Sequence, residues 1–211
     1  MQANFWHDMW ASGIVGFHQA EMNAFLTDYW QKLGLTGDET VLVPLCGKSL
    51  DMLWLTKQGH KVLGVELSQQ ALDEFLTENN VTAQAVQHTH YCGYELESLT
   101  LLCGDFFHLT AEDCQDVKAV YDRAAIVALP PEMRAQYVMH LRSILPKGTR
   151  YLMITMEYDQ SLVPGPPFSV PEKEVCQLFS DVESIEKVHE VSFVHKGVPR
   201  TEMVFVIEAS G

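Results

Sequence analysis

Basic side chains are scarce in this 211-residue sequence: 14 Lys and Arg residues stand against 28 Asp and Glu residues, and the formal net charge at pH 7 is −14. A nucleic-acid partner would require a basic surface that neutralises phosphates, and an anionic membrane surface would repel this chain. We therefore predict no nucleic-acid partner and no membrane partner. A small-molecule partner fits the composition, and a cationic ligand would not be repelled.

Other signals are also missing. No apolar run approaches the ~18 residues that cross a bilayer, and residues 1–8 lack the basic head and apolar stretch of a secretion signal. The five cysteines form no Cys-x-x-Cys pair, which favours a reducing cytoplasm, with Cys46 and Cys103 as small apolar fillers. A Gly-x-Ser-x-Gly elbow is absent, which argues against a serine hydrolase. The His and Cys residues of 88–92 indicate an exposed strand rather than a metal site, because no further ligand lies nearby.

The chain is 47% hydrophobic, which suffices for one well-buried domain. We predict a single domain over 1–211, with an N-terminal aromatic lid and helix in 1–33 and a sheet core in 40–211. Helical spacing of apolar residues predicts a helix over about 17–33, ended by Gly34. The residues before it are expected to have little local structure. Trp6, Trp10 and Phe17 form either a lid over a ligand or ordinary core packing.

Apolar runs that predict strands alternate with amphipathic segments that predict helices. The strands are expected at 41–45, 61–66, 99–103, 117–121 and 149–157, and the helices at about 49–58, from 68 onward, 131–145 and 172–179. Segment 80–98 predicts only a short strand near 81–86 and an exposed turn at Gly93. Two alternating runs, 185–195 and 202–208, predict a closing antiparallel hairpin. This alternation predicts an α/β fold with a parallel sheet, specifically the Rossmann-like, seven-stranded class I S-adenosylmethionine-dependent methyltransferase fold.

The first strand–helix–strand unit carries the strongest ligand signal. Its first strand ends in a turn with one glycine, Gly47, and its second strand ends in Glu66, 19 positions later. A carboxylate there offers two acceptors to the vicinal hydroxyls of a ribose. The three-glycine fingerprint that cradles a pyrophosphate is absent, so an adenosine ligand without phosphates fits better, and S-adenosylmethionine is the commonest. The alternative for Glu66 is a solvated acid in front of the next helix.

Other strand ends add candidates, because ligands of open α/β sheets bind beyond the carboxyl ends of the strands. Asp105 can accept a hydrogen bond from the adenine amino group while Phe106 packs on the ring, although an ordinary turn is the alternative for Asp105. Arg123 precedes the apolar stretch 124–129, where a guanidinium needs a partner. That partner is either Asp122, in a structural ion pair, or a ligand such as the cofactor or an anionic acceptor.

Six sequence blocks, spread over almost the whole chain, resemble one family. They are Phe5-Trp6-His7-Asp8-Met9-Trp10 with Gly16-Phe17-His18-Gln19, then Pro44-Leu45-Cys46-Gly47-Lys48, residues 59–66, Asp122-Arg123-Ala124, Leu129-Pro130-Pro131 and residues 164–171. The blocks resemble the thiopurine S-methyltransferase family in its bacterial branch, and the Pro-Leu-Cys-Gly-Lys and Pro-Gly-Pro-Pro-Phe blocks are the specific ones. In mammalian relatives the position of Ala124 is often Gly, and that of Asp105 is Ser.

The resemblance implies that the chain binds S-adenosylmethionine, with S-adenosylhomocysteine as its product, and transfers the methyl group to the sulfur of a thiopurine or another aromatic or heterocyclic thiol. The implied cofactor-binding residues are Trp10, Leu45, Glu66, Asp105, Phe106 and Arg123, and Phe17 and Arg123 are implied near the acceptor. Transfer between two sulfurs requires in-line geometry in a dry pocket. An acidic thiol or a thione needs little help from a base, so we predict no dedicated catalytic residue.

Three alternatives stay open. Bacterial relatives are linked to methylation of selenium and tellurium compounds, which makes metalloid detoxification an alternative physiological role. A nicotinamide-dependent oxidoreductase would use a similar sheet, although the single glycine argues against it. A non-enzymatic module that binds an adenosine ligand would keep only the cofactor site. We predict a cytoplasmic monomer, because no long apolar stripe is left over.

Overall fold

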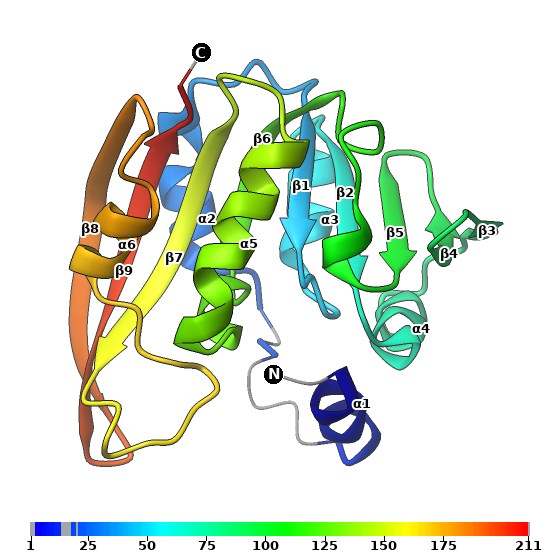
Figure 1. The fold of residues 1–211 in the computed structure, drawn as a ribbon. Helices are drawn as coiled ribbons and strands as arrows, with labels where there is room; N and C mark the ends of the chain where they lie inside the picture. The colour runs from blue at the N-terminus through cyan, green and yellow to red at the C-terminus, as the bar shows by residue number, and fades with distance from the viewer. Residues whose placement is uncertain (1–2, 14–17, 20, 211) are drawn as a thin grey trace.

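The computed structural model describes residues 3–13, 18, 19 and 21–210, which are built around one mixed β-sheet (Figure 1). Within these residues nine strands lie in the order β3-β4-β5-β2-β1-β6-β7-β9-β8. Their bounds are β1 Thr40–Pro44, β2 Lys61–Glu66, β3 Gln84–Gln87, β4 Cys92–Glu95, β5 Leu99–Cys103, β6 Val117–Arg123, β7 Arg150–Tyr158, β8 Ser184–His195 and β9 Val198–Glu208. The five central strands run parallel, and antiparallel pairs close both edges.

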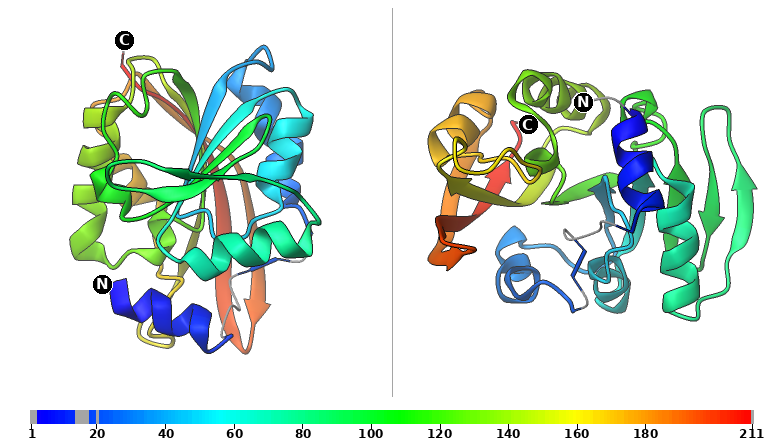
Figure 2. Two further views of the ribbon diagram at one scale, coloured as in Figure 1. Left: turned by 90° about the vertical axis from the view of Figure 1, so that its right-hand side faces the viewer. Right: turned by 90° about the horizontal axis from the view of Figure 1, so that it is seen from below.

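Helices cover both faces of the sheet (Figure 2). Their bounds are α1 Ala3–Ala11, α2 Ala24–Tyr29, α3 Asp51–Lys57, α4 Gln69–Glu78, α5 Pro131–Ile144 and α6 Glu172–Leu178, with 3₁₀ turns η1 Trp30–Leu33, η2 Phe106–His108 and η3 Ile126–Ala128. Apolar residues of α5 and α6 join one hydrophobic cluster with the sheet, and those of α2, α3 and α4 join the other. None of the described helices is long and apolar enough to cross a membrane.

The sheet reverses its direction of winding between β1 and β6. From β1 the chain passes to β2 and then β5 on one side, and it then crosses to β6 and β7 on the other. Val41, Leu42 and Val43 of β1 are buried, as expected for a parallel strand that is covered on both faces. The two windings leave a crevice at the carboxyl ends of β1 and β6, where doubly wound sheets bind their ligands.

The predicted α/β class, with a parallel sheet and a closing hairpin, is confirmed, but the sheet has nine strands instead of seven. The two extra strands, β3 and β4, form an antiparallel hairpin against β5. Gly93 was predicted in a turn and lies inside β4, where an added Cβ would be 1.9 Å from the Leu101 carbonyl oxygen. The hairpin is largely exposed, so it lacks the alternation of apolar and polar residues that marks a strand in sequence.

Three boundaries also differ from the predictions. The residues predicted to have little local structure include helix α1. The helix predicted from 17 begins only at Ala24, where the Asn23 side chain accepts a hydrogen bond from the Phe25 N–H at 2.9 Å and caps it. Gly34 ends this segment as predicted, at φ 60°.

The closing hairpin turns on two residues only, Lys196 and Gly197, whose φ angles of 50° and 80° fit a type I′ turn.

Candidate functional site

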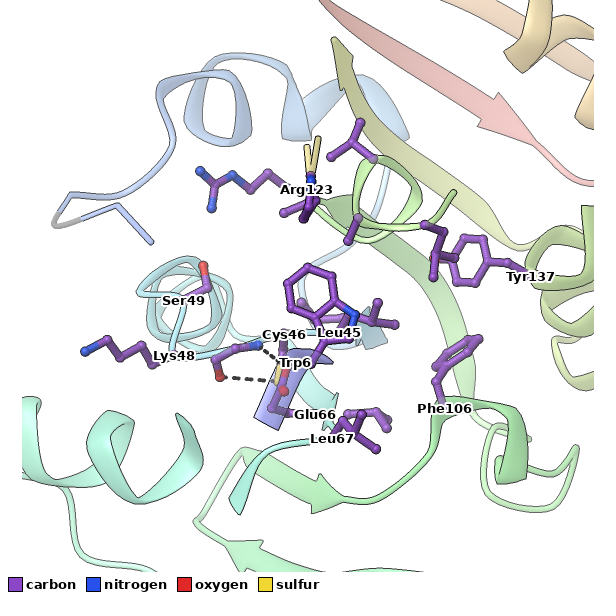
Figure 3. A pocket seen from close by; sticks show the side chains of 18 of the residues that line it. Trp6, Leu45, Cys46, Lys48, Ser49, Glu66, Leu67, Phe106, Arg123 and Tyr137 are labelled. Carbon is purple, nitrogen blue, oxygen red and sulfur yellow. Dashed lines mark hydrogen bonds between the residues drawn. The ribbon is translucent and has the colours of Figure 1, made fainter. Parts of the chain in front are cut away.

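A pocket opens at the carboxyl ends of β1, β2, β5 and β6 (Figure 3) and encloses about 1410 Å³, including its open mouth. Its lining contains all six residues predicted to bind the cofactor: Trp10, Leu45, Glu66, Asp105, Phe106 and Arg123. These residues come from five segments that are distant in sequence. Phe17, predicted near the acceptor, lies outside the described residues.

The turn after β1 forms one end of the pocket. Leu45 and Gly47 both adopt left-handed backbone conformations, with φ angles of 50° and 52°, and the Cys46 N–H donates to the Val65 carbonyl of β2 at 3.0 Å. Trp10 lies against this turn, because a Cβ added at Gly47 would be 3.4 Å from the indole ring. The Gln70 side chain donates to the Trp10 carbonyl at 3.1 Å and so ties α1 to α4. The turn therefore lies in the pocket wall under an aromatic cover.

Glu66 is buried, 7% exposed, and its carboxylate is fixed by the backbone. One oxygen accepts the Gly47 N–H at 2.9 Å and the other accepts the Ser68 N–H at 2.9 Å. Burial raises the pKa of this carboxyl, and the two backbone hydrogen bonds oppose the rise. Each oxygen keeps a further lone pair, so the group can still accept hydrogen bonds from two hydroxyls. The alternative of a solvated acid is wrong because Glu66 is buried. Its hydrogen bond from the Ser68 N–H does lie in front of α4, as that alternative expected.

Asp105 and Phe106 line the pocket in different ways. Asp105 is exposed and its carboxylate accepts the Phe107 N–H at 2.9 Å, which caps the short turn η2. Phe106 is buried, with its ring centroid 5.3 Å from that of Tyr137 and 5.4 Å from that of His140. The two residues therefore place an acceptor and an aromatic wall side by side, the arrangement predicted for adenine. Whether they bind adenine stays a prediction.

Asp122 and Arg123 end β6, and they do not pair with each other. Asp122 is fully buried and accepts the Ile126 N–H at 3.1 Å and the Tyr137 hydroxyl at 2.8 Å. Burial raises its pKa to about 6, while these hydrogen bonds act in the opposite direction. Successive side chains of a strand point to opposite faces, so Arg123 lies instead in the pocket lining (Figure 3). Of the two partners predicted for Arg123, the ion pair is absent among the described residues, and a ligand stays the prediction.

Backbone strain gathers at this pocket. Only four described non-glycine residues have positive φ angles, and two of them, Leu45 and Ala124, line it. Ala124 has φ 77°, a conformation that suits the glycine often found there in mammalian relatives. Such strain costs of order 1–3 kcal/mol per residue and is concentrated at functional sites.

Several lining residues were not among the predicted site residues. Tyr121 of β6 lines the pocket, and its hydroxyl donates to the Asp51 carboxylate at 2.9 Å. Lys48 is 8% exposed and forms ion pairs with Glu74 and Glu78 at 2.8 and 2.6 Å. Other missed lining residues are Tyr137, Met133, Pro166 and Pro167. Lys48 and the two prolines lie in the specific sequence blocks, so the resemblance could have indicated them. Tyr137 is one of many apolar positions on α5, and nothing in the sequence distinguishes it from the others.

The fold is that of the S-adenosylmethionine-dependent methyltransferases. A Burkholderia thailandensis 1,6-didemethyltoxoflavin-N1-methyltransferase, solved with S-adenosylhomocysteine, superposes with a TM-score of 0.67 at 14% identity, covering 99% of this chain and 87% of that chain. The magnesium protoporphyrin IX methyltransferase of Synechocystis PCC 6803 gives a TM-score of 0.62 at 14% identity, covering 97% and 99%. At these identities the likeness establishes the fold.

Sequence similarity identifies the family. The family model described as thiopurine S-methyltransferase matches residues 1–209. The thiopurine S-methyltransferase of Pseudomonas entomophila strain L48 is 48% identical over 204 residues, 94% of either chain, and that of Marinobacter nauticus is 43% identical over 188 residues, 89% of this chain and 86% of the relative. This chain belongs to the thiopurine S-methyltransferase family. The predicted family, the methyltransferase function and the cofactor, S-adenosylmethionine, are confirmed.

Proposed function

We propose that the pocket binds S-adenosylmethionine through the six residues named above and that the protein methylates the sulfur of thiopurines or other aromatic or heterocyclic thiols. The single observation that carries the binding mode is Glu66, a buried carboxylate held by two backbone N–H groups at 2.9 Å. Such a group is positioned before the ligand arrives, so it binds ribose hydroxyls without a further loss of side-chain entropy.

The other residues complete the cofactor site. Asp105 accepts a hydrogen bond from the adenine amino group, and Phe106 packs on the ring. Trp10 covers the turn at Leu45, where an aromatic face suits a sulfonium. When bound, the cofactor supplies an electrophilic methyl group on a positively charged sulfur. The protein's task is to orient the two sulfurs in line and to exclude water from them.

Arg123 serves the acceptor in this proposal. Its guanidinium lies in a pocket wall that also includes the apolar residues Val127, Ala128 and Leu129, and it can donate hydrogen bonds to an anionic thiolate or to a thione. Attack by a thiolate neutralises charge, because the acceptor loses its negative charge as the sulfonium loses its positive charge. An apolar wall lowers the barrier to such a reaction, because it stabilises the charged reactants less than the less charged transition state. No residue needs to remove a proton at the sulfur.

Finer aspects belong to the same proposal. Selenium and tellurium compounds are the alternative acceptors, since the Arg123 guanidinium would also attract an oxyanion. We also propose that the chain is a single domain, with its N-terminal residues as a lid, and works as a monomer in a reducing cytoplasm. The five cysteines, all free, support the reducing compartment, and the contact of α1 with the pocket turn supports the lid.

Arg123 variants test the acceptor role. We expect Arg123→Ala to raise the KM for a thiopurine roughly tenfold or more, because a hydrogen bond to a charged group is lost, and Arg123→Lys to raise it less. Initial rates with radiolabelled S-adenosylmethionine measure both, and Arg142→Ala, which alters an arginine at the far end of α5, is the control. Equal kinetics in the two Arg123 variants would refute the role. Absence of methyl transfer to any thiol by the wild type would refute the function.

A further inference from the structure

Two free cysteines face each other at the edge of the sheet next to the pocket. Strands β4 and β5 lie side by side (Figure 1), and Cys92 in β4 is the direct antiparallel register partner of Cys103 in β5. Cys92 is exposed and Cys103 is half-buried. The Cys92 thiol lies 3.3 Å from the Gln69 side-chain oxygen and 4.0 Å from the Cys103 carbonyl oxygen. Both side chains of such a pair lie on the same face of the sheet.

This arrangement satisfies the geometry of a disulfide. Directly opposed residues of antiparallel strands have Cα atoms about 4.5–5.5 Å apart, and disulfides bridge Cα atoms about 4.4–6.8 Å apart. Burial and the neighbouring Cys92 thiol raise the pKa of the Cys103 thiol to about 12. Cys92 is exposed to solvent. An oxidant therefore reaches Cys92 first, and Cys103 lies in position to react with it.

Cys103 is also connected to the cofactor-binding acid. It is the parallel register partner of Glu66, and its thiol donates to the Leu67 carbonyl at 3.7 Å. The Gly104 N–H donates to the Glu66 carbonyl at 2.9 Å. Leu67 and Gly104 both line the pocket. A change at the Cys103 sulfur thus affects Leu67, the residue after Glu66, through one hydrogen bond. It affects Asp105 through the backbone of Gly104, which lies between the two residues.

We propose that Cys92 and Cys103 form a reversible disulfide on exposure to a peroxide, and that this modification weakens cofactor binding. The second half rests on the cofactor site proposed above. The Cys92 sulfur attacks one peroxide oxygen, which yields a sulfenic acid and releases water from hydrogen peroxide. The Cys103 sulfur then attacks the Cys92 sulfur, the S–S bond forms, and the sulfenic oxygen leaves as a second water. Two thiols are oxidised and one peroxide is reduced; a small dithiol reverses the reaction.

The expected effect on binding follows from the contact that is lost. In the disulfide the Cys103 sulfur no longer carries a proton, so its hydrogen bond to the Leu67 carbonyl disappears. Because this bond holds the Leu67 carbonyl at the edge of the pocket only in the reduced protein, we expect its loss to weaken the affinity for S-adenosylhomocysteine by a factor of roughly two, and by no more than about tenfold. By reciprocity, bound S-adenosylhomocysteine makes the disulfide harder to form by the same factor at equilibrium.

Hydrogen peroxide treatment of the full chain tests the proposal. We expect peptide mapping of the oxidised wild type to link Cys92 to Cys103, with the mass of two hydrogen atoms lost from the linked peptides, and dithiothreitol to restore both of these thiols. Cys92→Ser and Cys103→Ser should each fail to form this link. Cys176→Ser, which removes the exposed cysteine of α6, is the matched control and should form it as the wild type does.

The outcomes separate the two proposals. No Cys92–Cys103 link in wild type and Cys176→Ser, under conditions that oxidise Cys176 in the wild type, would overturn the modification. A link that leaves the calorimetric affinity for S-adenosylhomocysteine unchanged would overturn its effect on the site. If the fully reduced wild type does not bind S-adenosylhomocysteine, the cofactor site itself fails, while the mass and thiol measurements still decide whether the disulfide forms.

Discussion

Asp122 makes the stability of this protein depend on pH in an unusual direction. Burial raises the pKa of its carboxyl from 3.8 to about 6, against the opposing hydrogen bonds from Ile126 and Tyr137. In the unfolded chain the group ionises near 3.8, so between these two values the folded protein binds more protons than the unfolded chain. The free energy of unfolding contributed by this group is therefore fully present at low pH and declines as the pH rises through the folded value.

The magnitude follows from the two pKa values. Their difference corresponds to about 3 kcal/mol in total, of which about 1.4 kcal/mol is lost between pH 5 and pH 8. Asp122→Asn does not titrate and keeps an oxygen that can accept the Ile126 N–H. The stability of the wild type relative to Asp122→Asn should therefore fall by about 1.4 kcal/mol from pH 5 to pH 8. Any constant offset between the two proteins does not affect this difference.

Urea unfolding of both proteins at several pH values measures the effect, and Tyr137→Phe supplies a second check. Loss of the Tyr137 hydroxyl removes a hydrogen bond to the ionised carboxylate, so the pKa of Asp122 should rise further and the decline should move to higher pH. A wild-type stability that is constant or rises relative to Asp122→Asn over this range would refute the reasoning.

Three further substitutions test backbone strain and compare a buried ion pair with a half-exposed one. Ala124→Gly should stabilise the protein by about 0.5–1 kcal/mol, because release of left-handed strain exceeds the entropy cost of glycine; a lower Tm in thermal unfolding would contradict this. Glu174→Ala leaves the Arg134 guanidinium, 1% exposed, without its carboxylate and should cost about 3 kcal/mol. Glu172→Ala, which breaks a half-exposed pair with Lys187, should cost under about 1 kcal/mol in the same urea assay, and equal losses would refute the comparison.

Much of the site could be predicted because the residues that bind ligands in this fold follow strands that can be recognised from their apolar sequence. The apolar runs that end at Leu45, Glu66 and Arg123 are buried on both faces of the sheet, so their composition alone marks them. Once their strands are parallel neighbours, their carboxyl ends must meet. The six predicted cofactor residues accordingly line one pocket, although their contacts with the cofactor stay predictions.

The environment of these residues could not be read in the same way. Whether Glu66 is solvated or buried depends on the Gly47 and Ser68 N–H groups that converge on it, and this requires two loops to be placed in space. Asp122 and Arg123 are adjacent and of opposite charge, which made an ion pair plausible. The strand places them on opposite faces, and Tyr137, from a distant helix, takes the acceptor that the pair would have used.

Strand β4 and helix α1 were missed for a different reason, whereas the short strand predicted near 81–86 corresponds to β3. Strand β4 has only four residues, two of them exposed, so hydrophobic periodicity, the main signal in a single sequence, is weak there. Helix α1 does carry apolar residues at helical spacing, Phe5, Trp6, Met9 and Trp10, but its aromatic residues were assigned only to a lid. Gly93 resembled a turn residue because glycine is common in turns, whereas here it permits the close approach of the Leu101 carbonyl. The contact between Cys92 and Cys103 was invisible for the same reason, since it depends on the register of β4 with β5.

Calorimetric titration with S-adenosylhomocysteine tests the central claim most directly. The wild type should bind S-adenosylhomocysteine and not NAD. Glu66→Ala should bind S-adenosylhomocysteine roughly 100-fold more weakly, since a charge-assisted pair of hydrogen bonds to the ribose is lost. Glu132→Ala, on the exposed first turn of α5, should bind as the wild type does, and thermal unfolding should show both variants folded. Unchanged affinity in a folded Glu66→Ala, or no binding by the wild type, would contradict the account.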